Sequence, residues 1–150
     1  MSVLTDMPRK TKAEKEQFGH TINKIYQKLA SYHRFRFATM DVDTKEIKYV
    51  YPKSIVHGYV ETRIVKGNKR RDICCSDDTL IYTDRGWLRA DRIFVGDKIL
   101  VPSGKFIDVT GIQNDRVLRS VFDIQLWGGD NIVTRCGIIR CDQDGDTNDI

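Results

Sequence analysis

The sequence has few cysteines and prolines and no long apolar run. It holds four cysteines and three prolines in 150 residues, and the cysteines form no C-x-x-C pair. We therefore expect four free thiols, with no disulfide framework, no zinc ribbon or other metal site, and no cofactor. No stretch of 18 apolar residues is present, so the sequence predicts no membrane-spanning helix.

The chain also begins without the apolar segment that a secretory signal requires. Residues 1–16 read MSVLTDMPRKTKAEKE, which holds four basic and three acidic residues and no long apolar run. This start predicts a cytoplasmic protein. With 40% hydrophobic and 31% charged residues, the chain is long enough for one domain with its own apolar core.

Charge is distributed unevenly along the chain. Residues 1–75 hold 16 lysines and arginines against 8 acidic residues, whereas residues 76–150 hold 9 against 13. This asymmetry favours a protein partner or self-assembly through complementary charge. It does not favour nucleic acid, because no recognised nucleic-acid motif accompanies it and the basic run at 69–71 follows Gly67-Asn68 as in a solvated hairpin end. No small-molecule substrate is predicted.

Residues 11–33 show the periodicity of an amphipathic helix. Thr11 and Glu14 have the spacing of a capping box at its start. Apolar residues then recur at every third or fourth position on one side of the helix: Phe18, Ile22, Ile25, Leu29 and Tyr32. The first four form what we name the apolar stripe. We predict that this stripe docks on a partner protein, or alternatively that it covers the sheet of its own chain.

Beyond residue 34 the apolar period changes to two, which is typical of strands. Four segments are predicted as short antiparallel strands joined by polar turns: residues 35–40, 47–51, 59–66 and 71–75. One of these turns is predicted at Pro52-Lys53-Ser54. His57 is interpreted as a structural residue at a strand boundary.

The second half of the chain continues the strand pattern. Residues 106–112 alternate between apolar and polar side chains, and Asn114-Asp115 is predicted to turn the chain afterwards. The patterns divide the chain into three segments: an N-terminal arm and helix at 1–34, a β domain at 35–142 and an acidic tail at 143–150.

Two blocks of sequence resemble a known family. The first, from Cys75 to Pro102, contains Thr83, the Gly86-Trp87 pair, Ala90 and the Gly96-Asp97 pair. The second reads V-F-D-I at 121–124, D-N at 130–131 and G-I-I-R-C-D at 137–142. Together they resemble the central and closing blocks of Hint domains, the fold shared by inteins and hedgehog autoprocessing domains. The resemblance implies an all-β, horseshoe-shaped domain of pseudo-duplicated antiparallel strands, with Trp87 largely buried.

The residues that carry the family's chemistry are changed in this chain. The resemblance places Ser76 and Thr79 at the two ends of the family's T-x-x-H motif, so Thr79 stands where a histidine helps to activate the scissile amide. It places Cys141 and Asp142 on the closing histidine and asparagine, and a carboxylate attacks an amide much more weakly than that asparagine does. We therefore expect no catalytic residues and interpret these four positions as vestigial.

The opening nucleophile of an intein is also absent, because no cysteine precedes Cys74. The resemblance therefore implies a Hint-derived domain without autoprocessing that acts as a structural or protein-interaction module, in a virion if it comes from a bacteriophage. One alternative is the C-terminal part of a split intein, or slow cleavage after Asp142. Another is a basic nucleic-acid-binding accessory protein. In a rival alignment, Cys74 is the opening nucleophile and residues 1–73 are an extein.

Overall fold

The computed structural model describes residues 31–140 of the chain. The apolar stripe, Cys141, Asp142 and the acidic tail lie outside the described residues. Ser31 and Tyr32 are helical, and the elements that follow are β1 (Phe37–Met40), β2 (Ile47–Val50), β3 (Pro52–Gly67), η1 (Asn68–Arg70), β4 (Ile73–Cys75), β5 (Leu80–Thr83), β6 (Gly86–Arg89), η2 (Ala90–Arg92), β7 (Lys98–Leu100), β8 (Phe106–Leu126), β9 (Ile132–Thr134) and β10 (Gly137–Arg140).

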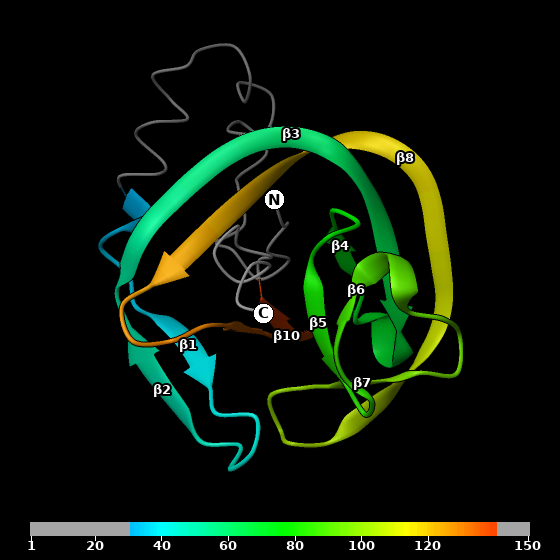
Figure 1. Ribbon diagram of the computed structural model, residues 1–150, viewed down its shortest axis with the longest axis horizontal. Coiled ribbons are helices and arrows are strands. Elements are labelled where there is room, and N and C mark those ends of the chain that lie inside the picture. Colours follow the sequence, from blue (N-terminus) through cyan, green and yellow to red (C-terminus); the bar gives the residue numbers. More distant parts are fainter. Residues whose placement is uncertain (1–30, 141–150) are drawn as a thin grey trace, which may run out of the picture.

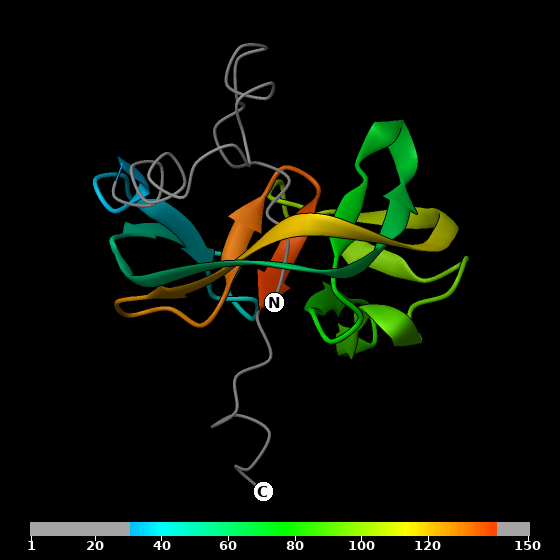
Figure 2. The same cartoon turned by 90° about the horizontal axis from the view of Figure 1, so that it is seen from above.

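The strands form two antiparallel sheets. The larger sheet has the order β4-β3-β8-β7-β5-β10-β9, with β6 paired to β5, and the smaller sheet is the β1–β2 pair. β3 and β8 run side by side as one long curved pair, which we name the β3–β8 ribbon (Figure 1). Seen from above, the ribbon crosses the width of the domain (Figure 2). The all-β antiparallel prediction is confirmed.

The β3–β8 ribbon runs through two positions where the sequence predicted turns. Pro52-Lys53-Ser54 begins β3, and His57 lies inside that strand. Asn114-Asp115 lies inside β8. Both predicted turns are wrong, because β3 and β8, far apart in the sequence, pair on either side of each irregular position and carry the chain straight through it.

A bulge accommodates the residues that would have formed the second turn. Thr62 pairs with Val117 and Ile64 pairs with Gln113, so residues 114–116 lie opposite the single residue Arg63. Arg116 has a φ of 53° there, in the left-handed region. Extra residues of this kind bend a strand and increase its twist, which is consistent with the curvature of the ribbon.

The core lies where the ribbon meets the other strands of the large sheet. Aliphatic side chains from most of the long and short strands are buried in it: Ile55, Val65, Ile73, Ile81, Ile99, Val109, Ile124, Ile132 and Ile139. Burial of each such side chain stabilises the fold by about 1.5–3 kcal/mol. Among the described residues no helix is long and apolar enough to span a membrane.

Hydrogen bonds of the Asn131 side chain connect the small sheet to the large one. Its side chain is buried just before β9, where Oδ1 accepts a hydrogen bond from the Met40 N–H at 2.9 Å and Nδ2 donates to the Met40 carbonyl at 2.8 Å. The Thr39 hydroxyl also donates to Oδ1, at 3.3 Å. The amide thus bonds both backbone groups of one β1 residue, so the Asp-Asn pair of the closing block has a structural role here.

Candidate functional site

Ser76 and Thr79 lie on the turn that joins β4 to β5. The turn is closed by a hydrogen bond from the Thr79 N–H to the Ser76 carbonyl at 3.2 Å. Both side chains are buried, with 6% of Ser76 and 1% of Thr79 exposed. We name residues 76–79 the polar turn. The two vestigial positions that fall in the described residues are therefore adjacent in space and shielded from water.

The hydroxyl groups of the polar turn form a short hydrogen-bonded series. Ser76 Oγ donates to Asp78 Oδ1 at 2.5 Å and lies 3.0 Å from Thr79 Oγ1. A serine hydroxyl has one hydrogen to donate, so Thr79 is the donor in the second bond. The hydroxyls of both residues are thus satisfied within the turn.

The last described strand ends beside the polar turn. β10 pairs with β5 in a register that sets Arg140 opposite Leu80 and Ile139 opposite Ile81. Leu80 directly follows Thr79, so the topology delivers the chain to the polar turn at the residue before Cys141. The positions of Cys141 and Asp142 themselves lie outside the described residues.

Cys75 precedes the polar turn and is fully buried. Burial, followed by the neighbouring Cys74, raises the pKa of the Cys75 thiol far above its usual range, although Arg63 and a hydrogen bond with Thr79 act in the opposite direction. The nucleophilic form of cysteine is the thiolate. Cys75 therefore remains a protonated, unreactive thiol at neutral pH.

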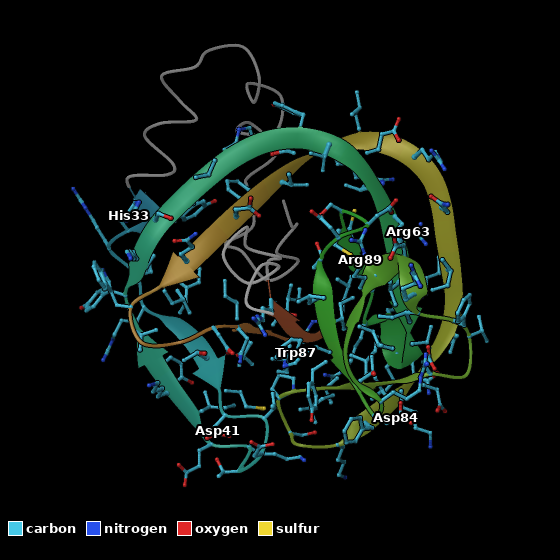
Figure 3. All side chains as sticks on the ribbon, viewed as in Figure 1. His33, Asp41, Arg63, Asp84, Trp87 and Arg89 are labelled. Carbon is cyan, nitrogen blue, oxygen red and sulfur yellow. The ribbon has the colours of Figure 1, made fainter. Side chains whose placement is uncertain are left out.

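Ion pairs and backbone bonds hold the polar turn to its neighbours. Arg63 Nε on β3 donates to Asp77 Oδ1 at 2.7 Å. The Ala90 N–H donates to the Thr79 carbonyl at 2.8 Å, and the Asp91 N–H donates to the Asp77 carbonyl at 3.2 Å. Figure 3 shows Arg63 on β3 and Trp87 near β10. The turn is thus anchored on two sides, by β3 and by η2.

No protein-family model matches the chain, and no curated protein matches its sequence. Solved structures do match. A DnaB intein from Synechocystis sp. PCC 6803 is 19% identical, with a TM-score of 0.66 over 79% of this chain and 86% of the intein. A DnaX mini intein from Spirulina platensis is 25% identical, with a TM-score of 0.61 over 71% and 81%. A bacterial intein-like domain from Clostridium thermocellum is 16% identical, with a TM-score of 0.61 over 71% and 80%.

This chain has a Hint fold. The sequence resemblance and the structural likeness agree on this point. Identities this low establish the fold alone.

The Hint fold does not support the rival alignment with Cys74 as the opening nucleophile. That alignment makes residues 1–73 an extein, a segment foreign to the domain. β3 lies within that segment, yet it pairs with β8 along its whole length, and Cys74 itself pairs with Ile64 of β3. Residues 52–67 are therefore an integral part of the Hint domain.

The glycine pairs of the central block shape two turns of the Hint domain. Gly86 has a φ of 89° and Gly96 a φ of 100°, in the region that glycine adopts most readily. After the second glycine, Asp97 accepts hydrogen bonds from the Phe94 N–H at 2.9 Å and from Arg85 at 2.8 Å. Desolvation acts to raise the pKa of Asp97, but these bonds and the Arg85 charge hold it below the usual value.

Trp87 is only partly buried, which is less than the resemblance implied. In the described part of the chain β6 pairs only with β5. The indole packs edge-on against Tyr82, with ring centroids 5.2 Å apart, and also against the apolar cluster that contains Met40 and Ile138. The Arg140 guanidinium lies 5.9 Å from its centroid. Trp87 thus connects the central block to the end of β10.

A cavity of about 340 Å³ opens beside Trp87. Its lining comes from the β1–β2 hairpin, the tip of β6 and the loop before β9: Thr39, Met40, Asp41, Val42, Asp43, Lys48, Trp87, Gly128, Gly129, Asp130 and Asn131. The sequence did not predict this cavity, because its walls come from three segments far apart in the chain. No periodic or motif signal links such segments.

The two histidines of the described residues lie away from the polar turn. His33 is exposed, and His57 Nε2 lies 2.7 Å from Ser120 Oγ within the ribbon. Arg63 marks the point where β3 contacts the polar turn. His57 lies six residues away along β3, so the two residues are about 20 Å apart. Cys74, Cys75 and Cys136 are free thiols, and residues 31–140 contain no group of three histidine, cysteine or acidic side chains that could hold a metal ion.

Proposed function

We propose that this Hint-derived domain no longer splices or cleaves and serves as a structural or protein-interaction module. The observation that carries the proposal is the state of the polar turn. Thr79, at the position of the family's histidine, is buried and hydrogen-bonded to Ser76. An aliphatic hydroxyl group neither loses nor gains a proton as a titrating group near neutral pH, so it cannot supply general acid–base assistance, which is typically worth about 10²–10⁴-fold in rate.

Two further features support the loss of chemistry. Cys75, the thiol next to the polar turn, is held protonated by burial and so is a poor nucleophile. At the closing block, Cys141 and Asp142 occupy the positions of the family's histidine and asparagine. Activation of the scissile amide then lacks its histidine, and cleavage at the closing block lacks its asparagine and histidine. A role as a bacteriophage virion or assembly component is part of the same proposal and rests on the resemblance.

Mass spectrometry of the purified chain under reducing conditions tests the proposal. We expect the intact mass of 17.4 kDa after prolonged incubation. Loss of residues 143–150 from the unmodified chain would contradict the proposal.

A variant in which the family's catalytic residues are restored tests the proposal more directly. Thr79→His, Cys141→His and Asp142→Asn together should permit cleavage after residue 142, since that step needs the asparagine and not an N-terminal nucleophile. The matched control carries the two closing-block changes and keeps Thr79, and it should cleave more slowly. Equal cleavage in both would show that Thr79 does not account for the lost activity.

The second candidate function is the C-terminal part of a split intein. The register that sets Arg140 opposite Leu80 favours it, because the closing block then reaches the polar turn as a working site would require. Under this hypothesis, residues 143–150 are released or ligated when a complementary N-terminal fragment is added. Co-expression with intein N-terminal fragments, followed by mass spectrometry, separates it from the first proposal.

A further inference from the structure

One face of the β3–β8 ribbon carries a continuous series of rings. The register pairs His57 with Phe122 and Tyr59 with Ser120, and these alternate residues share a face of the ribbon. The His57 ring centroid lies 5.1 Å from that of Tyr59 and 5.1 Å from that of Phe122. Tyr32 packs edge-on against Phe122, with centroids 6.0 Å apart. We name this face the ring face.

The ring face is covered at one end and open at the other. Tyr32 is 3% exposed and packs into the core with Ile55 and Ile124. Farther along the ribbon, Tyr59 is 53% exposed and Leu118, two residues beyond the partner of Tyr59, is 66% exposed. Large apolar side chains that stand together in water favour a covering partner.

The residue that covers the closed end belongs to the amphipathic pattern of residues 11–33. Ser31 and Tyr32 are helical. In the sequence, Leu29, Ile25, Ile22 and Phe18 precede Tyr32 by 3, 7, 10 and 14 positions, which is the spacing of one helix face. A helix that continues backward from Tyr32 therefore presents the apolar stripe on the side that Tyr32 already uses to contact the ribbon.

The dimensions of the two surfaces agree. From Phe122 to Leu118, four residues of strand span about 13 Å. From Tyr32 to Ile22, ten residues of helix span about 15 Å. On the other side of Phe122, away from Leu118, the ribbon offers no exposed apolar surface to the stripe, because Ile55 and Ile124 are already buried. The open part of the ring face is thus about as long as the part of the stripe from Leu29 back to Ile22, whereas Phe18, four residues farther along a helix, would extend about 6 Å past it.

We propose that residues 22–29 dock as a helix on the ring face of their own chain, with this part of the apolar stripe over Tyr59 and Leu118. This choice assigns the stripe to the chain itself rather than to a partner protein. It goes beyond the proposed function and does not depend on whether the domain splices.

Limited digestion with trypsin, read by mass spectrometry, tests the docking in the full chain. Lys24 and Lys28 lie between residues of the stripe and report on its protection. Two neighbouring residues give a matched pair of variants, because Leu118 lies on the ring face and Val117, 43% exposed, lies on the opposite face. We expect slow cleavage at both lysines in the unmodified chain, at least tenfold faster cleavage in Leu118→Glu, and no change in Val117→Glu.

A variant of the helix itself provides the reciprocal test. Ile25→Glu should accelerate cleavage at Lys24 and Lys28 as strongly as Leu118→Glu does, while the melting temperature of the β domain stays within a few degrees in both. Rapid cleavage of the unmodified chain would overturn the proposal and return the stripe to a partner protein. Equal acceleration by Val117→Glu would overturn it too. Protection that grows with protein concentration, together with a dimer in sedimentation, would place the stripe on a second copy and also overturn it.

Discussion

We expect alkaline pH to destabilise the domain through the thiol of Cys75. The side chain is fully buried, and burial, followed by the neighbouring Cys74, raises its pKa above the usual range. The folded domain therefore keeps this thiol protonated at a pH where the same thiol in the unfolded chain has ionised. Unfolding then releases a proton, so the free energy of unfolding falls as the pH rises.

The magnitude follows from the difference between the two pKa values. A free thiol ionises near a pKa of about 8.5, and each pH unit above it shifts the free energy of unfolding by about 1.4 kcal/mol while the folded thiol stays protonated. The loss from Cys75 is therefore small below about pH 8 and reaches about 2 kcal/mol at about pH 10. That is a large part of the roughly 5–15 kcal/mol that stabilises an ordinary domain.

Urea denaturation of the unmodified chain and of Cys75→Ala, at several pH values between about 7 and 10, measures this effect. The variant is less stable near neutral pH, because a small buried group is removed. Its curve of stability against pH should nevertheless be flatter, so the gap between the two proteins narrows by about 2 kcal/mol toward the alkaline end. Parallel curves would refute the reasoning, since other titrating groups are common to both proteins.

Gly137→Ala should lower the free energy of unfolding by about 1–3 kcal/mol, because the new Cβ would lie 2.8 Å from Ile73 Cδ1. Gly111→Ala is the control, with its nearest atom at 3.5 Å, and equal losses would contradict the packing argument. Asp97→Asn should reduce the acid destabilisation that develops below about pH 4, because hydrogen bonds hold this pKa low and that stabilisation is lost as the pH falls; an unchanged acid limb in urea denaturation would count against it. Trp87→Ala should cost less than the roughly 3–5 kcal/mol of a fully buried residue, and a larger loss on thermal unfolding would show that the indole carries more of the core than its exposure indicates.

The sequence predicted the fold where the signal is local. Alternation predicted the strand at residues 106–112, which begins β8. The pairs Gly86-Trp87 and Gly96-Asp97 carried the family resemblance, and both glycines do have a positive φ. These features depend on a few neighbouring residues. The central and closing blocks then pointed to the Hint fold, which the structural likeness confirms.

The sequence misled where distant pairing decides the outcome. Asn114-Asp115 has the composition of a turn, yet β3 supplies a partner strand on both sides of it, and a bulge opposite Arg63 absorbs the extra residues. Trp87 was expected to be largely buried, but it is only partly buried, because it lines a cavity. The cavity beside it also combines three distant segments. None of these properties can be predicted from a short stretch of consecutive residues.

The polar turn explains in physical terms how a Hint fold accommodates threonine at position 79. Thr79 is buried, and a buried hydroxyl without a partner would cost about 1–3 kcal/mol. Its partner is Ser76 Oγ, 3.0 Å away, and Ser76 in turn donates to Asp78. All three residues belong to one turn, so the bonds form whenever β4 and β5 take their places in the sheet. Threonine at this position is therefore compatible with folding, and it leaves the position without a group that titrates near neutral pH.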